Sequence, residues 1–271
     1  MATIRPVAVV TGASSGIGKA AALALAEAGF GVVGTSRNAA KVTAVDRATF
    51  VDLDVVSDAS VTSAVEEVIE RFGRIDVLVN NAGVGSTGAA EESSVAQAQR
   101  VFDTNVFGVI RMTRAVLPHM RAQRSGRIIN VSSVLGIIPA PYMALYSASK
   151  HAVEGYSESL DHEVRQHGVR TVLVQPAFTN TSFEANSMWA DTPLPVYARQ
   201  RQVFEQVMEA AIKDSDDPSI VAKAILAAAT DAKPKLRYTA GALAGRVSTL
   251  RRIVPARAFD RQIRKLNRLP G

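Results

Sequence analysis

Residues 7–18 read VAVVTGASSGIG and join a run of four apolar residues to an alanine-rich segment through a turn with three glycines. The apolar run predicts a buried strand, and the segment after the turn predicts a helix. Glycines allow a sharp turn and a close approach of backbone to a diphosphate, and the first N–H groups of a helix attract negative charge. A turn that needs glycine only for its backbone is the alternative. The strand–turn–helix context favours a nucleotide-binding turn, made by Gly12, Ser14, Ser15, Gly16, Ile17 and Gly18.

The same alternation of short apolar runs and helical patterns continues through the first two-thirds of the chain. We predict strands at residues 7–10, 31–35, 49–53, 75–79, 127–132 and 170–175, and helices at 16–28, 57–72, 95–117 and 146–167. This order is typical of an α/β, Rossmann-type doubly wound parallel sheet with helices on both faces.

The last third of the chain has a different pattern. Residues 178–214 are rich in proline and small polar residues at first, and their length predicts a substrate lid. We expect further helices at 199–212 and 218–230 and a last strand at 235–239. The domain organisation predicted here is one Rossmann-fold catalytic domain over residues 1–240, followed by a basic amphipathic C-terminal extension over 241–271.

Composition limits the function classes. The chain has 271 residues, of which 47% are hydrophobic, and it has no cysteine. Disulfides, thiolate metal sites and cysteine nucleophiles are therefore excluded, and we predict no metal site. The chain shows neither a signal-peptide pattern nor an apolar run of membrane-spanning length, so we expect a cytoplasmic protein.

Positive charge is concentrated in the C-terminal extension. From Arg246 onward the chain carries eight Lys and Arg residues and one acidic residue, Asp260. This segment therefore has a net charge of +7, and the rest of the chain has a net charge of −1, which together give the +6 of the whole sequence. We therefore expect no nucleic-acid partner. Helical spacing predicts an apolar stripe through Phe259, Ile263, Leu266 and Leu269, and a similar stripe through Val247, Leu250 and Val254. A helix packed on protein with a solvated basic face is favoured; contact with a membrane surface and a cap on the substrate cleft are the alternatives.

The spacing of the glycine turn, with Thr11 before it, resembles the cofactor turn of short-chain dehydrogenases/reductases. The resemblance recurs in order over about residues 5–182, and the motifs that carry it are Asp54-Val55, Asn80-Asn81-Ala82-Gly83, Asn105, Ser133 and Tyr146-Ser147-Ala148-Ser149-Lys150. The C-terminal end resembles, less specifically, the 17β-hydroxysteroid and retinol dehydrogenase-like branch. The family implies the Rossmann-type fold already predicted and a nicotinamide-dependent oxidoreductase.

Tyr146 and Lys150 are four residues apart and share one face of a predicted helix. A nearby ammonium lowers the pKa of a phenol, which is the physical reason to pair them. Ser133 follows a predicted strand, where ligands bind in such sheets; Ser132 is its competitor, and the family register favours Ser133. By resemblance, Tyr146 protonates a carbonyl oxygen, Ser133 polarises it, and Lys150 also binds the nicotinamide ribose. By resemblance, Asn105 binds a water molecule that relays protons to Lys150. The alternative is a structural role, in which Asn105 braces the helix against the sheet.

The residues after the second strand favour NADP(H) over NAD(H). The usual acidic residue is replaced by Ser36, and Arg37 follows, so a hydroxyl and a guanidinium could bind a 2′-phosphate. A solvated Arg37 is the alternative. By resemblance, Asp54 binds the adenine amine, and the other cofactor contacts implied are Val55, Asn80, Ala82, Gly83, Pro176, Thr179 and Thr181. The family usually reads Pro-Gly where this chain has Pro176-Ala177, and alanine takes positive φ less readily than glycine.

The residues predicted to line the substrate cleft are mainly apolar: Leu135, Tyr142, Met143, Phe178, Met188 and Trp189. A hydrophobic ketone, aldehyde or alcohol is therefore the expected substrate, with plain core packing as the alternative. By resemblance, helices 95–117 and 146–167 would pair subunits into a homodimer or homotetramer. Two other functions stay open: a non-catalytic NADP(H)-binding sensor or scaffold, and a peripheral membrane protein acting through its tail.

Overall fold

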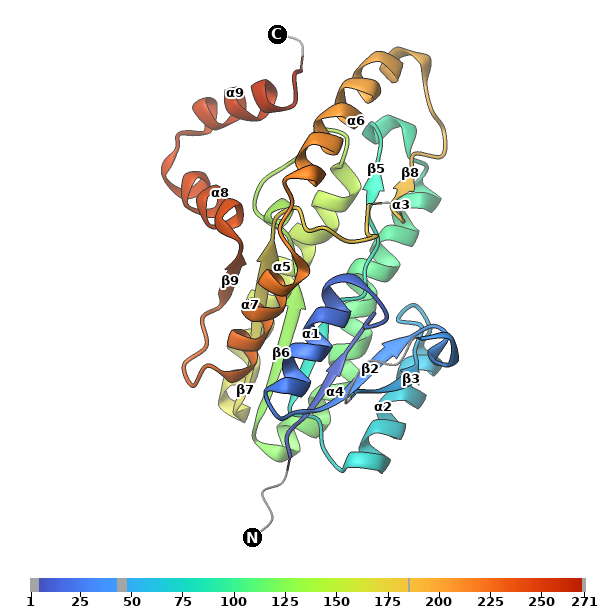
Figure 1. The fold of residues 1–271 in the computed structure, drawn as a ribbon, viewed down its shortest axis with the longest axis vertical. Helices are drawn as coiled ribbons and strands as arrows, with labels where there is room; N and C mark the ends of the chain where they lie inside the picture. Colours follow the sequence, from blue (N-terminus) through green and yellow to red (C-terminus); the bar gives the residue numbers. More distant parts are fainter. Residues whose placement is uncertain (1–4, 43–47, 185, 270–271) are drawn as a thin grey trace.

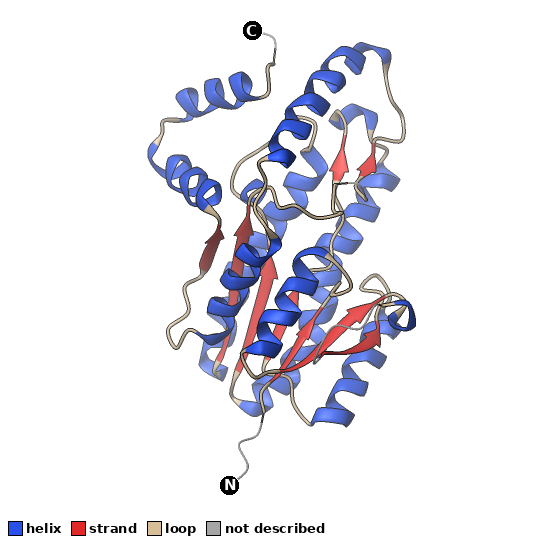
Figure 2. Ribbon diagram, in the orientation of Figure 1, coloured by secondary structure: helices blue, strands red, loops and turns tan. Residues whose placement is uncertain are grey.

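The computed structural model describes residues 5–42, 48–184 and 186–269. Its centre is a seven-stranded sheet in the order β3-β2-β1-β4-β6-β7-β9, in which every neighbouring pair is parallel. The strands are β1 (Val7–Val10), β2 (Gly31–Ser36), β3 (Ala48–Asp52), β4 (Val77–Asn80), β6 (Gly126–Val131), β7 (Val169–Pro176) and β9 (Arg237–Ala240). Helices cover both faces of the sheet (Figures 1 and 2). The predicted doubly wound α/β fold is confirmed.

Two hydrophobic cores lie on the two faces of the sheet. On one face, α1 (Gly16–Glu27) and α7 (Pro218–Thr230) pack together over Ala8 and Val10 of β1. On the other face, α2 (Asp58–Phe72), α4 (Gly108–Gln123) and α5 (Ala144–Val164) enclose Val7 and Val9. Successive residues of a strand point to opposite faces, so a strand covered on both sides is apolar throughout, as the run at residues 7–10 is.

The helix predicted at residues 95–117 is interrupted. The chain forms α3 (Val95–Phe102), a π-helical turn at Asp103–Phe107, and α4, which extends to Gln123. The buried side chain of Asn105 lies inside this turn. Such turns are frequent at functional sites because the extra residue re-aims side chains. The other boundary differences are small: α5 ends in a 3₁₀ turn at Arg165–His167, and β9 begins at Arg237.

The carboxyl ends of the strands lie beneath the predicted lid. Here β5 (Ser86–Thr87) and β8 (Met188–Trp189) form a second, two-stranded sheet, and the lid continues into α6 (Ala198–Lys213). The fully buried Glu92 carboxylate ties this region together by pairing with Arg201 of α6. Short 3₁₀ helices are also present at Ala39–Lys41, Ala90–Glu92, Val134–Gly136 and Pro195–Tyr197.

After β9 the chain forms two further helices, α8 (Ala242–Ile253) and α9 (Ala256–Leu266). In Figure 1, α8 rises from the edge strand β9 and α9 runs back towards α6, above the end of the sheet. Within the described ranges, none of the helices has the length and apolar character needed to cross a bilayer.

Candidate active site

The glycine turn is held in shape from the neighbouring strand. Gly12 and Gly16 have φ values of +64° and +52°, and a Cβ on Gly18 would lie 2.3 Å from the Gly12 carbonyl oxygen. The Thr11 hydroxyl accepts hydrogen bonds from the backbone N–H groups of Asn81 and Ala82, both at 2.9 Å. The Asn81 side chain in turn donates to the carbonyls of Thr11 and Gly12. The turn that follows β1 is therefore fastened to the end of β4.

The start of α1 offers what a diphosphate needs. Among the described residues no side chain caps this helix and no acidic residue lies in its first turn, so its N–H groups and positive dipole end face outward. Ser14 and Ser15 are exposed beside it. Thr181 closes the other side of the turn, since its Cγ2 would lie 3.1 Å from a Cβ on Gly16. These residues fit a dinucleotide cofactor.

The predicted adenosine end of the site lies after β2 and β3. Ser36 is the last residue of β2, and its hydroxyl accepts a hydrogen bond from the Asn38 N–H at 3.3 Å. The Arg37 side chain is exposed and has no hydrogen bond or ion pair within the described part of the chain. The nearest strand-end carboxylate, Asp52, accepts the Ala39 N–H at 2.6 Å. Asp54 is half-buried and Val55 is buried beside it.

The structure assigns different positions to the two adjacent asparagines. The Asn80 side chain is buried in the sheet, where its Nδ2 donates to Asn130 Oδ1 at 2.8 Å, and Asn130 donates to Ser157 on α5. The Asn80 amide is therefore used inside the sheet, and its place along the cofactor stays a prediction. Asn81 braces the glycine turn instead. Gly83 leaves room for Asn105, because a Cβ there would lie 3.2 Å from Asn105 Oδ1.

Three predicted catalytic side chains meet where β6 ends. Ser133 follows β6, its Oγ accepts the Leu135 N–H at 3.1 Å, and its side chain lies close enough to Tyr146 to lower the pKa of the phenol. The Lys150 ammonium lies 5.6 Å from the centroid of the Tyr146 ring. All three side chains are buried.

The neighbouring serine has a different environment. The Ser132 hydroxyl is buried without a hydrogen-bond partner in the described chain. The geometry thus pairs Ser133, not Ser132, with Tyr146.

Burial dominates the ionisation of this cluster. It raises the pKa of Tyr146, the Ser133 side chain opposes the rise, and the Glu184 carboxylate adds to it. Burial also lowers the pKa of Lys150 to about 8, against the opposing charge of Glu154. We expected the ammonium to lower the pKa of Tyr146. In this structure Lys150 Nζ instead donates to the Val131 carbonyl at 2.9 Å, and burial has the largest influence on the pKa of the phenol.

The Asn105 side chain uses its amide within the protein. Its Oδ1 accepts the Val84 N–H at 2.8 Å, and its Nδ2 donates to the Val84 carbonyl at 2.9 Å and to Ser149 Oγ at 3.1 Å. These contacts join the π-helical turn to the loop after β4 and to α5. The side chain thus braces the site, as the alternative interpretation held, and the water relay stays a prediction.

An apolar cluster surrounds Tyr146 on the substrate side. Two of the predicted substrate residues, Leu135 and Met143, are buried in it, and Tyr142 packs against it with a φ of +62°, a strained value for a tyrosine. The cluster also includes residues that the motifs did not indicate, from the lid and from the tail: Phe183, Phe204, Met208, Ala244, Val247, Phe259 and Ile263. Met188 and Trp189 are not members of it; they form β8, and Trp189 is 54% exposed.

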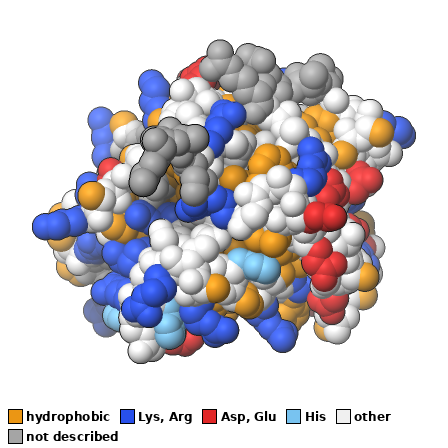
Figure 3. Space-filling view, turned by 90° about the horizontal axis from the view of Figure 1, so that it is seen from below, with side chains coloured by type: hydrophobic (Ala, Val, Ile, Leu, Met, Phe, Trp, Pro, Cys, Tyr) orange, Lys and Arg blue, Asp and Glu red, His pale blue; other side chains and the backbone are white. Residues whose placement is uncertain are grey.

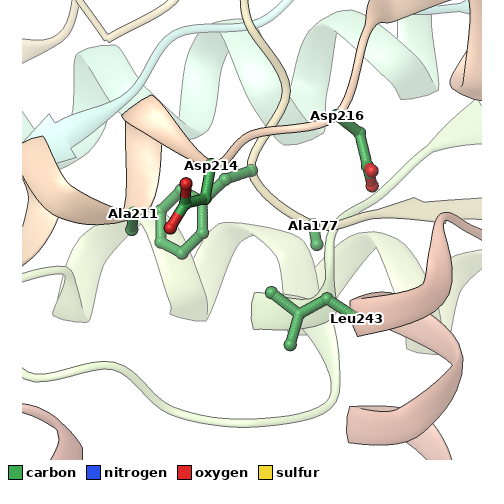
Figure 4. Close-up of a pocket in the computed structure, with 6 residues that line it drawn as sticks. Ala177, Ala211, Asp214, Asp216 and Leu243 are labelled. Carbon is green, nitrogen blue, oxygen red and sulfur yellow. The ribbon is translucent and has the colours of Figure 1, made fainter.

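Phe178 lies beside this cluster, in the wall of a cavity of about 260 Å³. Figure 4 shows Leu243 of α8 reaching towards Ala177, with the carboxylates of Asp214 and Asp216 on the lid side. Ala177 has no positive φ, because the described non-glycine residues with positive φ are Arg124, Tyr142 and Arg268. The turn after β7 therefore accepts alanine in place of the usual glycine, and its methyl group joins the apolar cluster. Thr179 is buried and donates to the Ala177 carbonyl at 3.2 Å.

Comparison with known proteins agrees with this geometry. The family model described as short chain dehydrogenase matches residues 6–191. A 3-ketodihydrosphingosine reductase from Bacteroides thetaiotaomicron is 47% identical over 178 residues, which cover 66% of this chain and 65%, just under two thirds, of the reductase. Retinol dehydrogenase 8 from Bos taurus is 36% identical over 259 residues, covering 84% of this chain and 79% of that protein.

Solved structures extend the similarity to the whole fold. A short-chain dehydrogenase from Streptomyces avermitilis has a TM-score of 0.83 and 33% identity and covers 98% of both chains. Two others hold different cofactors. A protein from Burkholderia phymatum in complex with NAD has a TM-score of 0.77 and 29% identity, with 90% and 92% coverage. One from Burkholderia cenocepacia in complex with NADP has a TM-score of 0.77 and 26% identity, with 96% and 98% coverage. The chain thus belongs to the short-chain dehydrogenase/reductase family and is an oxidoreductase of that family.

Proposed function

We propose that this protein interconverts a hydrophobic ketone or aldehyde and its alcohol, with NADP(H) as cofactor and Tyr146 as the general acid/base. The observation that carries the proposal is the buried contact of Tyr146 with Ser133 and its closeness to Lys150, inside an apolar cluster at the carboxyl end of the sheet. A bound nicotinamide would supply or accept the hydride.

The chain's own residues handle the oxygen and its proton. In the reduction, the Tyr146 hydroxyl gives its proton to the substrate oxygen. Ser133 Oγ accepts the Leu135 N–H, and its single hydrogen would be donated to the substrate oxygen once the substrate is bound. The Lys150 ammonium compensates the phenolate charge left on Tyr146. General acid–base help of this kind contributes ~10² to 10⁴-fold to the rate.

The preference for NADP(H) over NAD(H) rests on the end of β2. Arg37 is exposed and has no partner among the described residues, and Ser36 stands where an acidic residue would repel a 2′-phosphate. A free guanidinium binds phosphate oxygens with charge-assisted hydrogen bonds. Related structures hold either cofactor, so the argument depends on these two residues of this chain.

A hydrophobic, uncharged substrate is supported by what surrounds Tyr146. The cluster offers apolar side chains, and the adjoining cavity adds two carboxylates, Asp214 and Asp216, which would repel an anionic substrate. One Glu184 carboxylate oxygen is also buried without a partner in the described chain. The names of the relatives indicate a keto compound for one and retinol for the other.

We also propose a cytoplasmic homodimer or homotetramer that pairs through the surfaces of α3–α4 and α5. Val95 and Phe107 on the first of these surfaces are large exposed hydrophobic residues, which is typical of an interface. Sedimentation of the purified chain over a range of concentrations tests this assembly, and a monomer at all of them would contradict it.

The experiment for the proposed function is a panel of apolar ketones, aldehydes and alcohols, followed by nicotinamide absorbance with NADPH or NADP⁺ and with NADH or NAD⁺. We expect turnover of long-chain or polycyclic compounds, with lower KM for the phosphorylated cofactor. Cofactor binding without turnover of any compound would favour the sensor or scaffold alternative. Equal use of NADH would contradict the cofactor preference.

A further inference from the structure

Helix α8 has two faces with opposite surroundings. Its inner face packs on the protein: Ala244 is fully buried, and Arg251 donates to the Ile137 carbonyl and stacks on the Phe259 ring. Its outer face, at spacings that share one side of a helix, carries an exposed stripe. The stripe consists of Arg246, Leu250 (47% exposed) and Ile253 (70%). Burying these exposed apolar side chains against an apolar partner would be favourable, because it removes their surface from water.

Helix α9 repeats the arrangement with more charge. Phe259 and Ile263 point inward and pack against the cluster around Tyr146. No residue of α9 is fully buried, and Leu266 is 67% exposed. On its other side, the side chains of Arg257, Arg261 and Lys265 are exposed and have no hydrogen bond or ion pair among the described residues. The same holds for the side chain of Arg268, just after the helix. One face of α9 also lines an open hollow of about 480 Å³, formed by Ala256, Arg257, Asp260 and Arg261.

The segment that forms these two helices is strongly basic. From Arg246 onward it has eight basic residues against one acidic residue, Asp260. By contrast, the opposite end of the molecule shows acidic side chains gathered on one side and basic ones on the other (Figure 3). We call the exposed stripe of α8 together with Arg257, Arg261, Lys265 and Arg268 the tail surface.

We propose that the tail surface docks the protein on a membrane surface that contains anionic lipid. Basic side chains interleaved with exposed aliphatic ones are the combination that binds the headgroup region, through charge attraction and insertion of the apolar residues. A second copy of the chain fits poorly, since it would bring the same positive segment against this one. A nucleic acid would use the arginines and leave Leu250 and Ile253 in water.

The tail surface borders the cleft, so docking has a consequence for the substrate. The inner faces of α8 and α9 belong to the cluster that contains Tyr146 and Phe204. The Gln200 amide of α6 donates to the backbone carbonyls of Asn267 and Arg268 just after α9. A docked tail would therefore hold the apolar cleft against the bilayer, from which a hydrophobic substrate could enter. Docking itself needs neither cofactor nor turnover and is independent of the proposed function.

The test is co-sedimentation of the full-length protein with vesicles of phosphatidylcholine alone or with about 30% phosphatidylglycerol. One variant replaces Arg257, Arg261, Lys265 and Arg268 with Gln, and a second carries Leu250→Ser and Ile253→Ser. A matched control loses the same charge elsewhere, by replacing the exposed Arg121, Lys223, Lys233 and Lys235 with Gln. Circular dichroism confirms that each variant is folded.

We expect the wild type to bind the anionic vesicles, to be released by about 0.5 M NaCl, and to bind phosphatidylcholine weakly. The four-residue tail variant should lose at least about tenfold in partition coefficient, because each basic residue near an anionic surface adds attraction. The Leu250/Ile253 variant should also bind less, and the matched control should bind like the wild type. Equal loss by the control and the tail variant would overturn the proposal. The proposal would also be overturned if the wild type bound anionic vesicles no more strongly than neutral ones. That result includes the case in which the tail mediates self-association instead of membrane binding. Tyr146→Phe should still bind vesicles, which separates this test from the catalytic one.

Discussion

Lys150 lies one helical turn after Tyr146 on α5, with its ammonium 5.6 Å from the centroid of the tyrosine ring and hydrogen-bonded to the Val131 carbonyl at 2.9 Å. Both side chains are buried, so the charge of one is poorly screened from the other. If Tyr146 exchanges the proton as proposed, the protonation state of Lys150 should affect how easily Tyr146 gives it up.

The first prediction concerns pH. Burial lowers the pKa of Lys150 to about 8, so the ammonium is present below that pH and lost above it. The kcat/KM measured for the cofactor reports groups of the free enzyme. We expect it to fall on the alkaline side with an apparent pKa near 8, approaching tenfold per pH unit. A profile that stays flat to pH 10 would mean that the charge of Lys150 is not needed.

The second prediction concerns Glu154, the buried carboxylate one turn after Lys150. It raises the pKa of Lys150 and accepts hydrogen bonds from Gln175 and Arg237. Glu154→Gln removes the charge, so the alkaline limb of the same profile should move to lower pH. Glu158→Gln is the matched control, because Glu158 also pairs with Arg237 but is 42% exposed. If both variants shift the limb equally, Glu154 does not act on Lys150 directly.

The third prediction sets stability against activity at Lys150. Its folded pKa lies below its ordinary value of 10.5, so the folded state binds fewer protons than the unfolded state between about pH 8 and 10.5. The cost of the buried charge is full below pH 8 and disappears as the pH rises through that window. Lys150→Met should therefore raise the free energy of unfolding at pH 7 by about 1 to 3 kcal/mol. It should lower turnover by roughly 100-fold or more. Denaturant unfolding at pH 7 and at pH 10 measures the gain, which should be smaller at pH 10; an unfolding free energy lowered at pH 7 would contradict it.

The fourth prediction concerns the hydroxyl that fastens the glycine turn. Thr11→Val leaves the partly buried N–H groups of Asn81 and Ala82 without their acceptor. We expect a loss of about 1 to 3 kcal/mol in unfolding free energy and weaker cofactor binding. Thr171→Val is the matched control, since the Thr171 hydroxyl is buried with no hydrogen-bond partner in the described chain. The control should be neutral or stabilising. Similar losses in both variants would show that the Thr11 hydrogen bonds are not the cause.

The fifth prediction concerns cofactor choice. Arg37→Ala should raise the KM for NADPH by roughly tenfold or more and leave the KM for NADH unchanged, because only the phosphorylated cofactor carries the group that Arg37 would bind. Steady-state kinetics with both cofactors measures the difference. Equal changes for both would assign Arg37 a structural role.

Local pattern predicted the sheet and the glycine turn, because both depend on strand and helix periodicity and on a short motif. The choice of Ser133, Tyr146 and Lys150 needed the family resemblance as well, since pattern alone left Ser132 open. Side-chain direction was harder. Asn80 and Asn81 are neighbours, and only the position of β4 in the sheet decides that Asn80 points to Asn130 while Asn81 faces the turn.

Contacts between distant segments set the remaining limits. The π-helical turn depends on the pairing of Asn105 with Val84, which a helical pattern in one segment does not contain. Periodicity predicted the apolar stripe of α9, but its partner, the cluster around Tyr146, comes from the middle of the chain. Met188 and Trp189 were predicted to line the substrate cleft because they are apolar. Instead, they pair with β5 and are not members of the cluster around Tyr146.

The central claim is that Tyr146 exchanges the proton with the substrate oxygen, and one comparison tests it most directly. Cofactor binding and single-turnover hydride transfer are measured side by side for Tyr146→Phe and for Tyr156→Phe, a half-buried tyrosine of α5 that packs away from the site against the core of the sheet. We predict that Tyr146→Phe binds NADPH like the wild type and loses at least ~10²-fold in the rate of transfer, whereas Tyr156→Phe keeps that rate. Hydride transfer by Tyr146→Phe at the wild-type rate would contradict the account.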